Sequence, residues 1–507
     1  MNLDTRAHRA AQGIHRAVEV SEMTTPTRQQ HQPVERFDRF RSNKQRNQRI
    51  GAGVVAFAVI AAALVLVVKA MGDRDQSVPG VTPISASNVA TLHEIALAPT
   101  RGEAFRMASG NGVLVVSTGA NAGGPGGQLI GYPFPCGGGT DPACNPLWTG
   151  TVDDTPVVTV ADDVVYARGL GGATLYAYSV DCRMDGGVCD PLWSADLGGR
   201  SSSGQSQPPV VADGQVFVSN GPWLRAFDTS CANGSPSGAT CLPAWSAHLT
   251  DGVRALAFKD SILYVGTGPL GQPVQGEIGS IRAFNATCSK AQGCPLLWNQ
   301  TVPQVWSISV DGDTVYVGTN GLSDGIQAYP TSCAQQAGQC RPTWIAGTSC
   351  CTEVTTSDGV VYAHDHVSNT YGFAEGCASG GQTCQPTWQS SDLPFDPFVD
   401  FTAPHRAGDV VFVGGDAGTA YAYDANCAGV CHPSWQAEVD PKGIWDAMPL
   451  GDRLYVAAHD GLHVYATDPT APVGGSNGHE GAPWAAAALI AAIGVGIVMT
   501  VRGRRSA

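Results

Sequence analysis

The sequence predicts an all-β fold, an eight-bladed β-propeller, because a cysteine–tryptophan unit recurs seven times, at about 47 residues per repeat, beside strand-like stretches in a constant order. Each unit holds two cysteines a few residues apart and a tryptophan four positions after the second. Successive tryptophans lie 45, 52, 53, 46, 44 and 47 residues apart, a period typical of propeller blades rather than of helical solenoids with shorter units. The predicted structural disulfides join Cys136 with Cys144, Cys182 with Cys189, Cys231 with Cys241, Cys288 with Cys294, Cys333 with Cys340, Cys377 with Cys384 and Cys427 with Cys431, and the tryptophans are Trp148, Trp193, Trp245, Trp298, Trp344, Trp388 and Trp435.

Each repeat carries two strand-like stretches before its cysteines. The first is rich in β-branched and aromatic residues, as at 164–166, and the second ends in a small residue followed by an aromatic one, as at 175–178. A further stretch precedes this pair, clearest at 209–212, and the tryptophan segment supplies a fourth strand. The repeat is therefore expected to be a four-stranded blade.

The count of strands predicts how the ring closes. Eight copies of the paired strands occur, the first at 113–116 and the last at 454–465, but only seven cysteine–tryptophan units. A closed ring explains the difference if residues 90–97 form the outer strand of the eighth blade. Pairing the two ends of the array removes the free sheet edges that invite aggregation.

Two apolar runs flank the repeats. Residues 50–68 are 19 positions without a charge, and residues 484–501 add a second run of 18, so both are predicted to be transmembrane helices. The expected order along the chain is a mostly disordered basic tail (1–49), a transmembrane helix (50–70), a linker (71–88), the propeller (89–468), a Gly/Pro-rich linker (469–483), a second transmembrane helix (484–501) and a short basic tail (502–507).

Charged residues predict the orientation in the membrane. Ten Lys or Arg lie in residues 1–49 and three follow residue 501, which places both termini in the cytoplasm and the propeller outside. Sixteen cysteines, mostly at short spacing, agree with an oxidising exterior. Residues 71–483, between the two predicted helices, hold 15 Lys or Arg and 38 Asp or Glu, an acidic balance that excludes nucleic acid as a partner.

Two alternatives about the start of the chain stay open. A cleaved signal peptide ending near residues 68–70 is the rival interpretation of the first apolar run, although the 49-residue basic segment before it is long for such a peptide. Translation could begin at Met1 or at Met23. Neither alternative changes the predicted propeller.

The strand motifs resemble the pyrroloquinoline quinone (PQQ) type of propeller repeat. In that family a Val-Tyr-Val stretch, here residues 315–317, is followed by an aromatic-ending stretch, here residues 326–329, and by a tryptophan. The resemblance covers about residues 89–468 and implies that each tryptophan docks between neighbouring blades. Here a cysteine-closed loop replaces the Thr-Gly turn of that family, so we expect the disulfide to substitute for that turn.

Cys350 and Cys351 fall outside the repeat and are adjacent. With the other fourteen cysteines matched, these two are left to each other, and a disulfide between neighbours strains the peptide that joins them. PQQ-dependent alcohol dehydrogenases carry a similar adjacent-cysteine ring against their cofactor. The resemblance thus implies PQQ near Cys350 and Cys351, Ca²⁺ polarising the quinone, and Asp396 or Asp400 as the catalytic base.

One face of the last three blades gathers further polar residues. The connection that holds Cys351 shares a propeller face with the turns between second and third strands, where the candidate ligand-binding residues are His364, Asp365, His366, Asp416 and His459. A plainer interpretation is that aspartates in such turns serve the backbone, and a His-x-His pair alone does not define a metal site, so none is assigned. The sequence contains no evident zinc, haem, nucleophile-elbow or phosphate-loop motif.

Two functions follow as hypotheses from different classes. The first is a membrane-anchored, extracytoplasmic propeller that acts as a binding or scaffold module for protein or cell-envelope ligands, because the blades are regular and carry few insertions. The alternative is a PQQ-dependent quinoprotein oxidoreductase that uses Cys350 and Cys351 beside the cofactor. The first is favoured, since the long inter-blade insertions and Ca²⁺ ligands of quinoproteins have no match in this chain.

Overall fold

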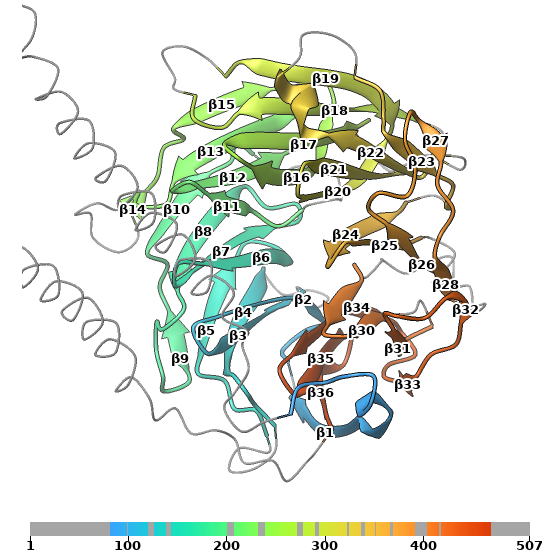
Figure 1. Ribbon diagram of the computed structural model, residues 1–507. Coiled ribbons are helices and arrows are strands. Elements are labelled where there is room, and N and C mark those ends of the chain that lie inside the picture. Colours follow the sequence, from blue (N-terminus) through green and yellow to red (C-terminus); the bar gives the residue numbers. More distant parts are fainter. Residues whose placement is uncertain are drawn as a thin grey trace, which may run out of the picture. The chain divides into compact units, whose positions relative to one another are not determined.

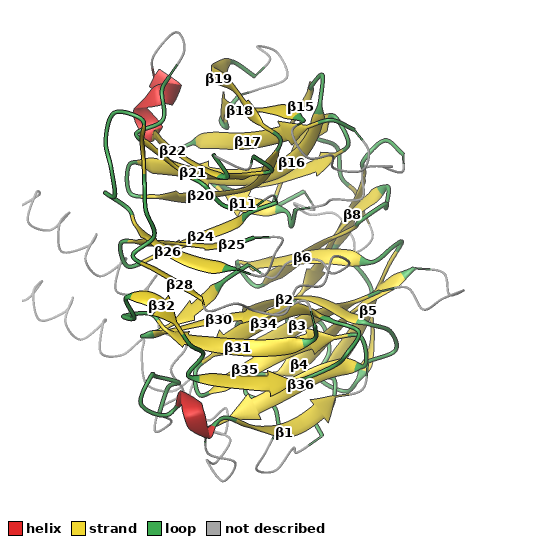
Figure 2. Ribbon diagram, turned by 90° about the vertical axis from the view of Figure 1, so that its right-hand side faces the viewer, coloured by secondary structure: helices red, strands yellow, loops and turns green. Residues whose placement is uncertain are grey.

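The computed structural model describes residues 82–467, except for residues 99, 120–125, 138–142, 200–206, 232–238, 271–276, 289–293, 322–323, 336–339, 350, 366–368, 391–402 and 415–416. These residues form eight β-sheets arranged around a central axis (Figures 1 and 2). The predicted all-β, eight-bladed propeller is therefore confirmed.

The first four blades follow one another along the chain, each running from an inner strand to an outer strand. In that order they are β2 (Ala104–Gly110), β3 (Val113–Thr118), β4 (Gly127–Pro133) and β5 (Trp148–Val152); β6 (Pro156–Ala161), β7 (Val164–Gly169), β8 (Thr174–Ser179) and β10 (Trp193–Asp196); β11 (Val210–Ala212), β12 (Gln215–Asn220), β13 (Trp223–Asp228) and β15 (Trp245–His248); β16 (Gly252–Lys259), β17 (Ile262–Gly268), β18 (Ile278–Asn285) and β19 (Leu296–Pro303).

The next three blades repeat this order. They are β20 (Val305–Asp311), β21 (Thr314–Thr319), β22 (Ile326–Pro330) and β23 (Trp344–Ala346); β24 (Glu353–Ser357), β25 (Val360–His364), β26 (Thr370–Ala374) and β28 (Trp388–Ser390); β29 (His405–Ala407), β30 (Val410–Gly414), β31 (Thr419–Asp424) and β33 (Trp435–Glu438). The described helical segments are the short 3-10 helices η1 (Val89–Thr91) and η2 (Thr331–Gln335).

The eighth blade joins the two ends of the described chain. Its strands β34 (Ile444–Leu450), β35 (Arg453–Ala458) and β36 (Gly461–Ala466) are completed by β1 (His93–Ala98), which pairs antiparallel with β36 (Figure 1). Closure by an N-terminal strand was predicted from residues 90–97 and is confirmed, with the strand starting three residues later. The closed ring leaves no unpaired blade at the junction.

Burial along each blade explains the sequence pattern of its strands. Second strands such as β3 and β35 are buried at every position, whereas the outer strand β5 alternates between buried and more exposed residues. Neighbouring blades cover both faces of a second strand, so its sequence is almost continuously apolar, while an outer strand needs apolar residues on alternate positions only. The side chains packed between blades form the core.

Tight turns join the first strand of a blade to the second. Asn111 and Gly112 have φ angles of 48° and 74°, and Asp213 and Gly214 have 50° and 71°. Two successive positive φ values define a type I′ hairpin turn, which Asn-Gly and Asp-Gly sequences adopt at little cost. The aspartates of these turns therefore serve the backbone.

All seven predicted disulfides are present with the expected pairing. They join Cys136 to Cys144, Cys182 to Cys189, Cys231 to Cys241, Cys288 to Cys294, Cys333 to Cys340, Cys377 to Cys384 and Cys427 to Cys431. Among the second cysteines of these pairs, Cys144, Cys241 and Cys384 are buried, whereas Cys294 and Cys340 are half-buried against the core. The disulfides thus belong to the packed interior of the ring as well as closing their loops.

Four of the cysteine loops also extend the sheet of a neighbouring blade. Each adds a parallel fifth strand to the outer edge of the preceding blade. These strands are β9 (Gly187–Cys189) on β5, β14 (Ala239–Thr240) on β10, β27 (Gln382–Thr383) on β23 and β32 (Gly429–Cys431) on β28. Because these loops pair with the backbone of the preceding blade, they link two blades, and the expectation that the disulfide substitutes for a turn stays a prediction.

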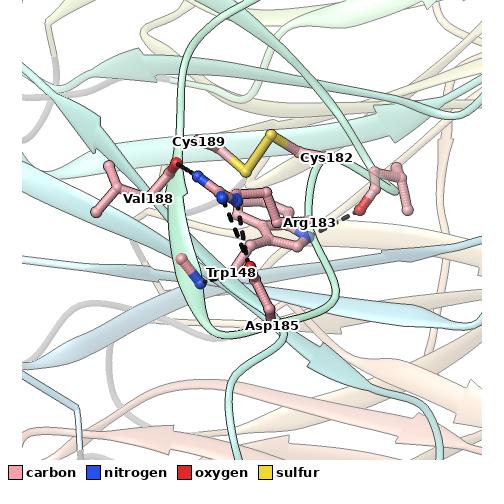
Figure 3. Close-up of a disulfide and its surroundings, with 8 residues drawn as sticks. Trp148, Cys182, Arg183, Asp185, Val188 and Cys189 are labelled. Atoms are coloured by element: carbon pink, nitrogen blue, oxygen red, sulfur yellow. Dashed lines mark hydrogen bonds and ion pairs between the residues drawn. A yellow bond between two sulfur atoms is a disulfide. The ribbon is translucent and has the colours of Figure 1, made fainter.

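The repeat tryptophans open the outer strands or lie within them and are buried. The Nε1 atoms of four of them donate hydrogen bonds to backbone carbonyl oxygens of the following blade, namely Trp148 to Val180, Trp245 to Ala286, Trp344 to Glu375 and Trp435 to Leu92. Figure 3 shows Trp148 beside the Cys182–Cys189 disulfide, whose loop also carries the exposed Arg183–Asp185 ion pair. The indole and the disulfide loop thus hold the same pair of blades together.

The two expected transmembrane helices, both tails and most of the two linkers lie outside the described residues. Within the part that the structure describes, no helix is long and apolar enough to cross a membrane.

Candidate functional site

The candidate site lies where the first strands of the blades surround the propeller axis. Four of these strands contain a β-bulge, between Ala104 and Met107, Val253 and Ala255, Val305 and Ser307, and Ile444 and Asp446. The residues inserted at these bulges include Arg106, Arg254, Trp306 and Trp445. A bulge turns a side chain away from its regular direction, and in these inner strands the turned side chains are large or charged.

A cavity of about 200 Å³ is lined by residues from six blades. Its apolar wall consists of Met107, Val158, Pro208 and Ala403. Its polar lining consists of Arg106, Gln207, Glu353, His405 and Asp446. Because these residues lie in or immediately before first strands, the cavity is on the axis of the ring, and we call it the axial cavity.

Asp446 is a carboxylate of the axial cavity with three neighbouring partners. Its Oδ2 accepts a 3.0 Å hydrogen bond from the backbone N–H of Met107, and its Oδ1 accepts one of 3.0 Å from Ala447 and lies 3.3 Å from Nε2 of His405. Burial alone would raise the pKa of this carboxyl, but the hydrogen bond and charge of His405, with the charge of Arg106 and the Met107 N–H, bring it below the usual value. Asp446 therefore carries a negative charge that joins three blades.

Arg106 lies beside Asp446 without pairing with it directly. Its Nη1 donates a 2.8 Å hydrogen bond to the carbonyl oxygen of Trp445, and its guanidinium lies 5.2 Å from the ring centre of Phe105. The Phe105 and Trp445 rings are 5.1 Å apart, and Trp445 in turn lies 5.3 Å from the ring of His459. An aromatic group thus holds the arginine at the edge of the axial cavity.

Several sequence-predicted residues can be located. Nδ1 of His459 lies 2.8 Å from Oε1 of Glu103, and the His459 side chain stays partly exposed. His364 and Asp365 are fully buried, with Asp365 accepting hydrogen bonds from the N–H groups of Ser349 and Asn369 and from the hydroxyl of Tyr371. Neither of these two side chains reaches the surface of the face on which they were expected to bind a ligand.

The His364 imidazole is isolated from solvent. Its Nδ1 lies 3.0 Å from Oγ1 of Thr370, and within the described residues its Nε2 has no hydrogen-bond partner. Burial lowers the pKa of His364 to about 4, against a smaller opposing effect of Asp365. This histidine is therefore neutral near pH 7 and serves the interior of the sixth blade.

Cys351 lies at the expected connection between the fifth and sixth blades. It has a φ of 67°, is 8% exposed, and packs against Trp306, which is equally buried. Cys350 lies outside the described residues, as do His366, Asp396, Asp400 and Asp416. The Cys350–Cys351 bond and the catalytic-base assignment consequently remain predictions.

The described residues contain no group of three His, Cys, Asp or Glu side chains that could hold a metal ion. Within the described residues, the indole of Trp306 packs against Cys351 and fills the space beside it that a planar PQQ ring would need.

Sequence reasoning missed the charged residues of the axial cavity. Glu353 and Asp446 occupy the same register in their blades, each paired with a residue near the end of a second strand, His364 and Ala457. The available signal was a charge within an otherwise apolar first strand. Without the ring geometry, such a charge cannot be distinguished from one that points to solvent.

Comparisons with known proteins show the fold. The structure is similar to BamB from Moraxella catarrhalis, with a TM-score of 0.50 and 15% identity over 74% of this chain and 97% of that one. It is also similar to Chaetomium thermophilum Sqt1 bound to the N-terminus of ribosomal protein L10, with a TM-score of 0.54 and 12% identity over 74% and 99%. A quinohemoprotein alcohol dehydrogenase from Pseudomonas putida has a TM-score of 0.51 and 13% identity over 78% and 79%.

These similarities show the fold alone, since the identities are low. No family model matches the sequence. No curated protein matches it either.

Proposed function

We propose that this protein is a membrane-anchored, extracytoplasmic β-propeller that binds a protein or cell-envelope ligand at its axial cavity. The observation that carries the proposal is the composition of that cavity, in which charged side chains of four blades meet an apolar wall. Binding sites combine such apolar walls with a few placed polar groups. Of the similar structures, Sqt1 was determined in complex with the N-terminus of a ribosomal protein, which supports peptide binding by this fold.

The proposal is tested by site-specific photo-cross-linking of the full-length protein in its membrane. A benzophenone amino acid replaces Gln207 at the axial cavity or, as a control, Val188 on the exposed disulfide loop of the second blade. We expect a discrete adduct from position 207 that position 188 does not give. Identical adducts from both positions, or none from 207, would contradict a ligand site at the axis.

Anchoring and orientation are tested separately. Thr5→Cys and Ser87→Cys place one reporter in the basic tail and one beside the propeller, and an impermeant maleimide is applied to intact cells. We expect labelling at position 87 alone, above the background of the wild-type protein, and labelling at position 5 only after lysis. Labelling of both positions in intact cells would rule out the proposed topology.

The alternative, a quinoprotein oxidoreductase, rests on the adjacent cysteines at the connection between the fifth and sixth blades, and the packing of Cys351 counts against it. The contact between Cys351 and Trp306 would have to open to admit a planar cofactor. For that reason we derive no reaction step through PQQ or Ca²⁺.

A further inference from the structure

Arg106 is held in place but not neutralised by the protein. Its backbone N–H donates to Oγ of Ser117 at 2.9 Å, and its guanidinium donates one hydrogen bond, to Trp445 O, while lying against Phe105. No carboxylate of the described residues lies within 4.0 Å of it. The other guanidinium N–H groups are not enclosed by protein, and Arg106 lines the axial cavity.

Asp446, whose charge interacts with that of Arg106, already has other partners. Asp446 accepts from Met107 and Ala447 and pairs with His405, so its two oxygens face those groups. Its charge acts on Arg106 from a distance, without forming the two-pronged hydrogen bonds that a guanidinium can make with a carboxylate. The remaining N–H groups of the Arg106 guanidinium are therefore available to a ligand.

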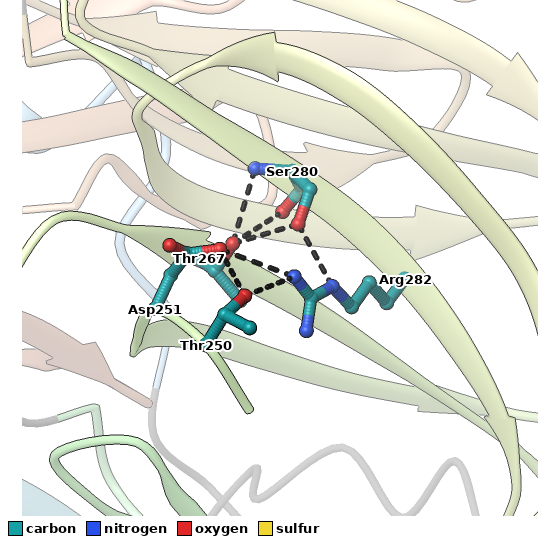
Figure 4. A network of polar contacts seen from close by, with 5 residues as sticks. All are labelled: Thr250, Asp251, Thr267, Ser280 and Arg282. Carbon is teal, nitrogen blue, oxygen red and sulfur yellow. Dashed lines mark hydrogen bonds and ion pairs between the residues drawn. The ribbon is translucent and has the colours of Figure 1, made fainter. Parts of the chain in front are cut away.

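Three other arginines of the chain show the contrast. Arg282 donates to Oγ of Ser280 at 2.9 Å and to Oδ2 of Asp251 at 3.1 Å, and Thr250 adds a further contact (Figure 4). Arg183 and Arg406 likewise lie 3.2 Å from a carboxylate oxygen. These arginines are supplied with an acid, and Arg106 is positioned without one.

From this geometry we infer that the axial cavity binds a carboxylate, with the guanidinium of Arg106 gripping its two oxygens and the apolar wall of Met107, Val158 and Pro208 receiving the attached carbon chain. The inference rests on the proposed binding function and names the ligand chemistry of that same site. A volume of about 200 Å³ suits a single side chain or chain terminus, because pockets for drug-sized ligands measure roughly 300–1,000 Å³.

The surrounding charge favours a carboxylate carried by a polypeptide segment over a free small anion. Residues 71–483 have 38 acidic and 15 basic side chains, so they repel free anions. A protein segment brings one carboxylate among neutral or basic neighbours, which the acidic propeller attracts. Glu353 on the wall of the axial cavity also disfavours a dianion such as phosphate.

The experiment uses the full-length protein in nanodiscs and calorimetric titration with defined probes. The probes are the capped peptide Gly-Gly-Glu-Gly-Gly, its Gln counterpart, pentaglycine with a free or an amidated C-terminus, and glutarate as a free anion. The variants are Arg106→Gln and, as a matched control, Arg225→Gln, because Arg225 similarly lies over an aromatic ring, Trp223, at 5.0 Å.

We expect the Glu peptide or the free C-terminus to bind and its uncharged counterpart to bind at least about tenfold more weakly, since a charge-assisted pair is removed. Arg106→Gln should weaken binding about ten- to hundredfold, and Arg225→Gln should not change it. Tighter binding of glutarate than of every peptide would reassign the site to a free anion and overturn the polypeptide part of the inference.

A second readout covers the possibility that Arg106→Gln fails to fold. The bound probe should protect Arg106, but not Arg225, of the wild-type protein from phenylglyoxal. Equal binding of charged and uncharged probes, or equal protection of both arginines, overturns the carboxylate assignment. If the photo-cross-link from position 207 persists in that case, the binding module stands and only its ligand chemistry is wrong.

Discussion

The indole Nε1 of Trp435 donates a 2.9 Å hydrogen bond to the carbonyl oxygen of Leu92, a residue 343 positions earlier in the chain. Leu92 immediately precedes β1, the strand that completes the eighth blade. Between successive blades, the indole N–H groups of Trp148, Trp245 and Trp344 donate the same kind of hydrogen bond to a backbone carbonyl oxygen of the following blade. Ring closure therefore uses the same tryptophan contact as the repeat, with the N-terminal segment taking the place of a following blade.

We expect Trp435→Phe to destabilise the propeller more than Trp298→Phe. Both changes shorten a buried ring, but within the described residues Trp298 Nε1 has no hydrogen-bond partner, so only Trp435→Phe leaves a buried carbonyl unsatisfied. The difference should be about 1 kcal/mol. Thermal unfolding of the two variants side by side measures it, and equal midpoints would show that the hydrogen bond to Leu92 does not stabilise closure.

Removing the Cys182–Cys189 disulfide should loosen the neighbouring blade as well as its own. Cys189 ends β9, which pairs with β5 of the first blade, and the closed loop spans 7 positions. Cys182→Ser/Cys189→Ser should cost about 2 kcal/mol by the chain-entropy argument. Hydrogen exchange should accelerate in residues 148–152. Faster exchange confined to the second blade would contradict a link between blades.

Asp446→Asn should lower stability by about 2 kcal/mol, because a buried charged acceptor shared by Met107, Ala447 and His405 is lost. The pKa of Asp446 is lowered in the fold, so its contribution is present above the unfolded-state pKa and disappears as the pH falls through the folded value. The variant should therefore lose less stability on acidification than the wild type.

Asp358→Asn is the control for that experiment. Asp358 forms a 3.2 Å ion pair with Arg406 but is 74% exposed, and such surface pairs contribute little. Its unfolding midpoint should stay close to that of the wild type, with an unchanged pH profile. A loss as large as that of Asp446→Asn would mean that burial does not decide the effect.

His364 should make the propeller sensitive to mild acid. The pKa of His364 is about 4 in the folded protein, against an ordinary value of 6.5. Between pH 6.5 and 4 the unfolded chain therefore binds more protons than the folded one, and the free energy of unfolding falls as the pH drops. The full loss is on the order of 3 kcal/mol. His364→Asn should flatten this part of the pH profile, and His93→Asn, at an exposed position of β1, should not. Unfolding midpoints between pH 7 and 4 test this.

Titration of PQQ with Ca²⁺ into the full-length protein should give no saturable heat. The reason is that Trp306 covers Cys351 where the planar ring would have to insert. Micromolar binding that weakens in Cys350→Ser/Cys351→Ser would reverse this expectation and make the oxidoreductase the leading hypothesis.

The sequence by itself determined the all-β class, the number of blades and the disulfide pairing. These are repeated, local properties: a period of about 47 residues, alternating strand patterns and cysteines a few positions apart constrain the chain without knowledge of distant contacts. Even closure by the N-terminal strand could be predicted, because one outer strand was missing from a count of eight.

Only the tertiary structure decided which residues meet at the axis. Four blades supply the charged residues of the axial cavity, which are Arg106, Glu353, His405 and Asp446. These residues are far apart in the sequence: Met107 and Asp446, for example, are separated by 339 positions. Whether such a side chain points inward depends on a bulge and on the packing of adjacent blades, which no local pattern encodes. The same dependence on the ring placed His364 and Asp365 in the interior, and turned four cysteine loops into strands of their neighbours.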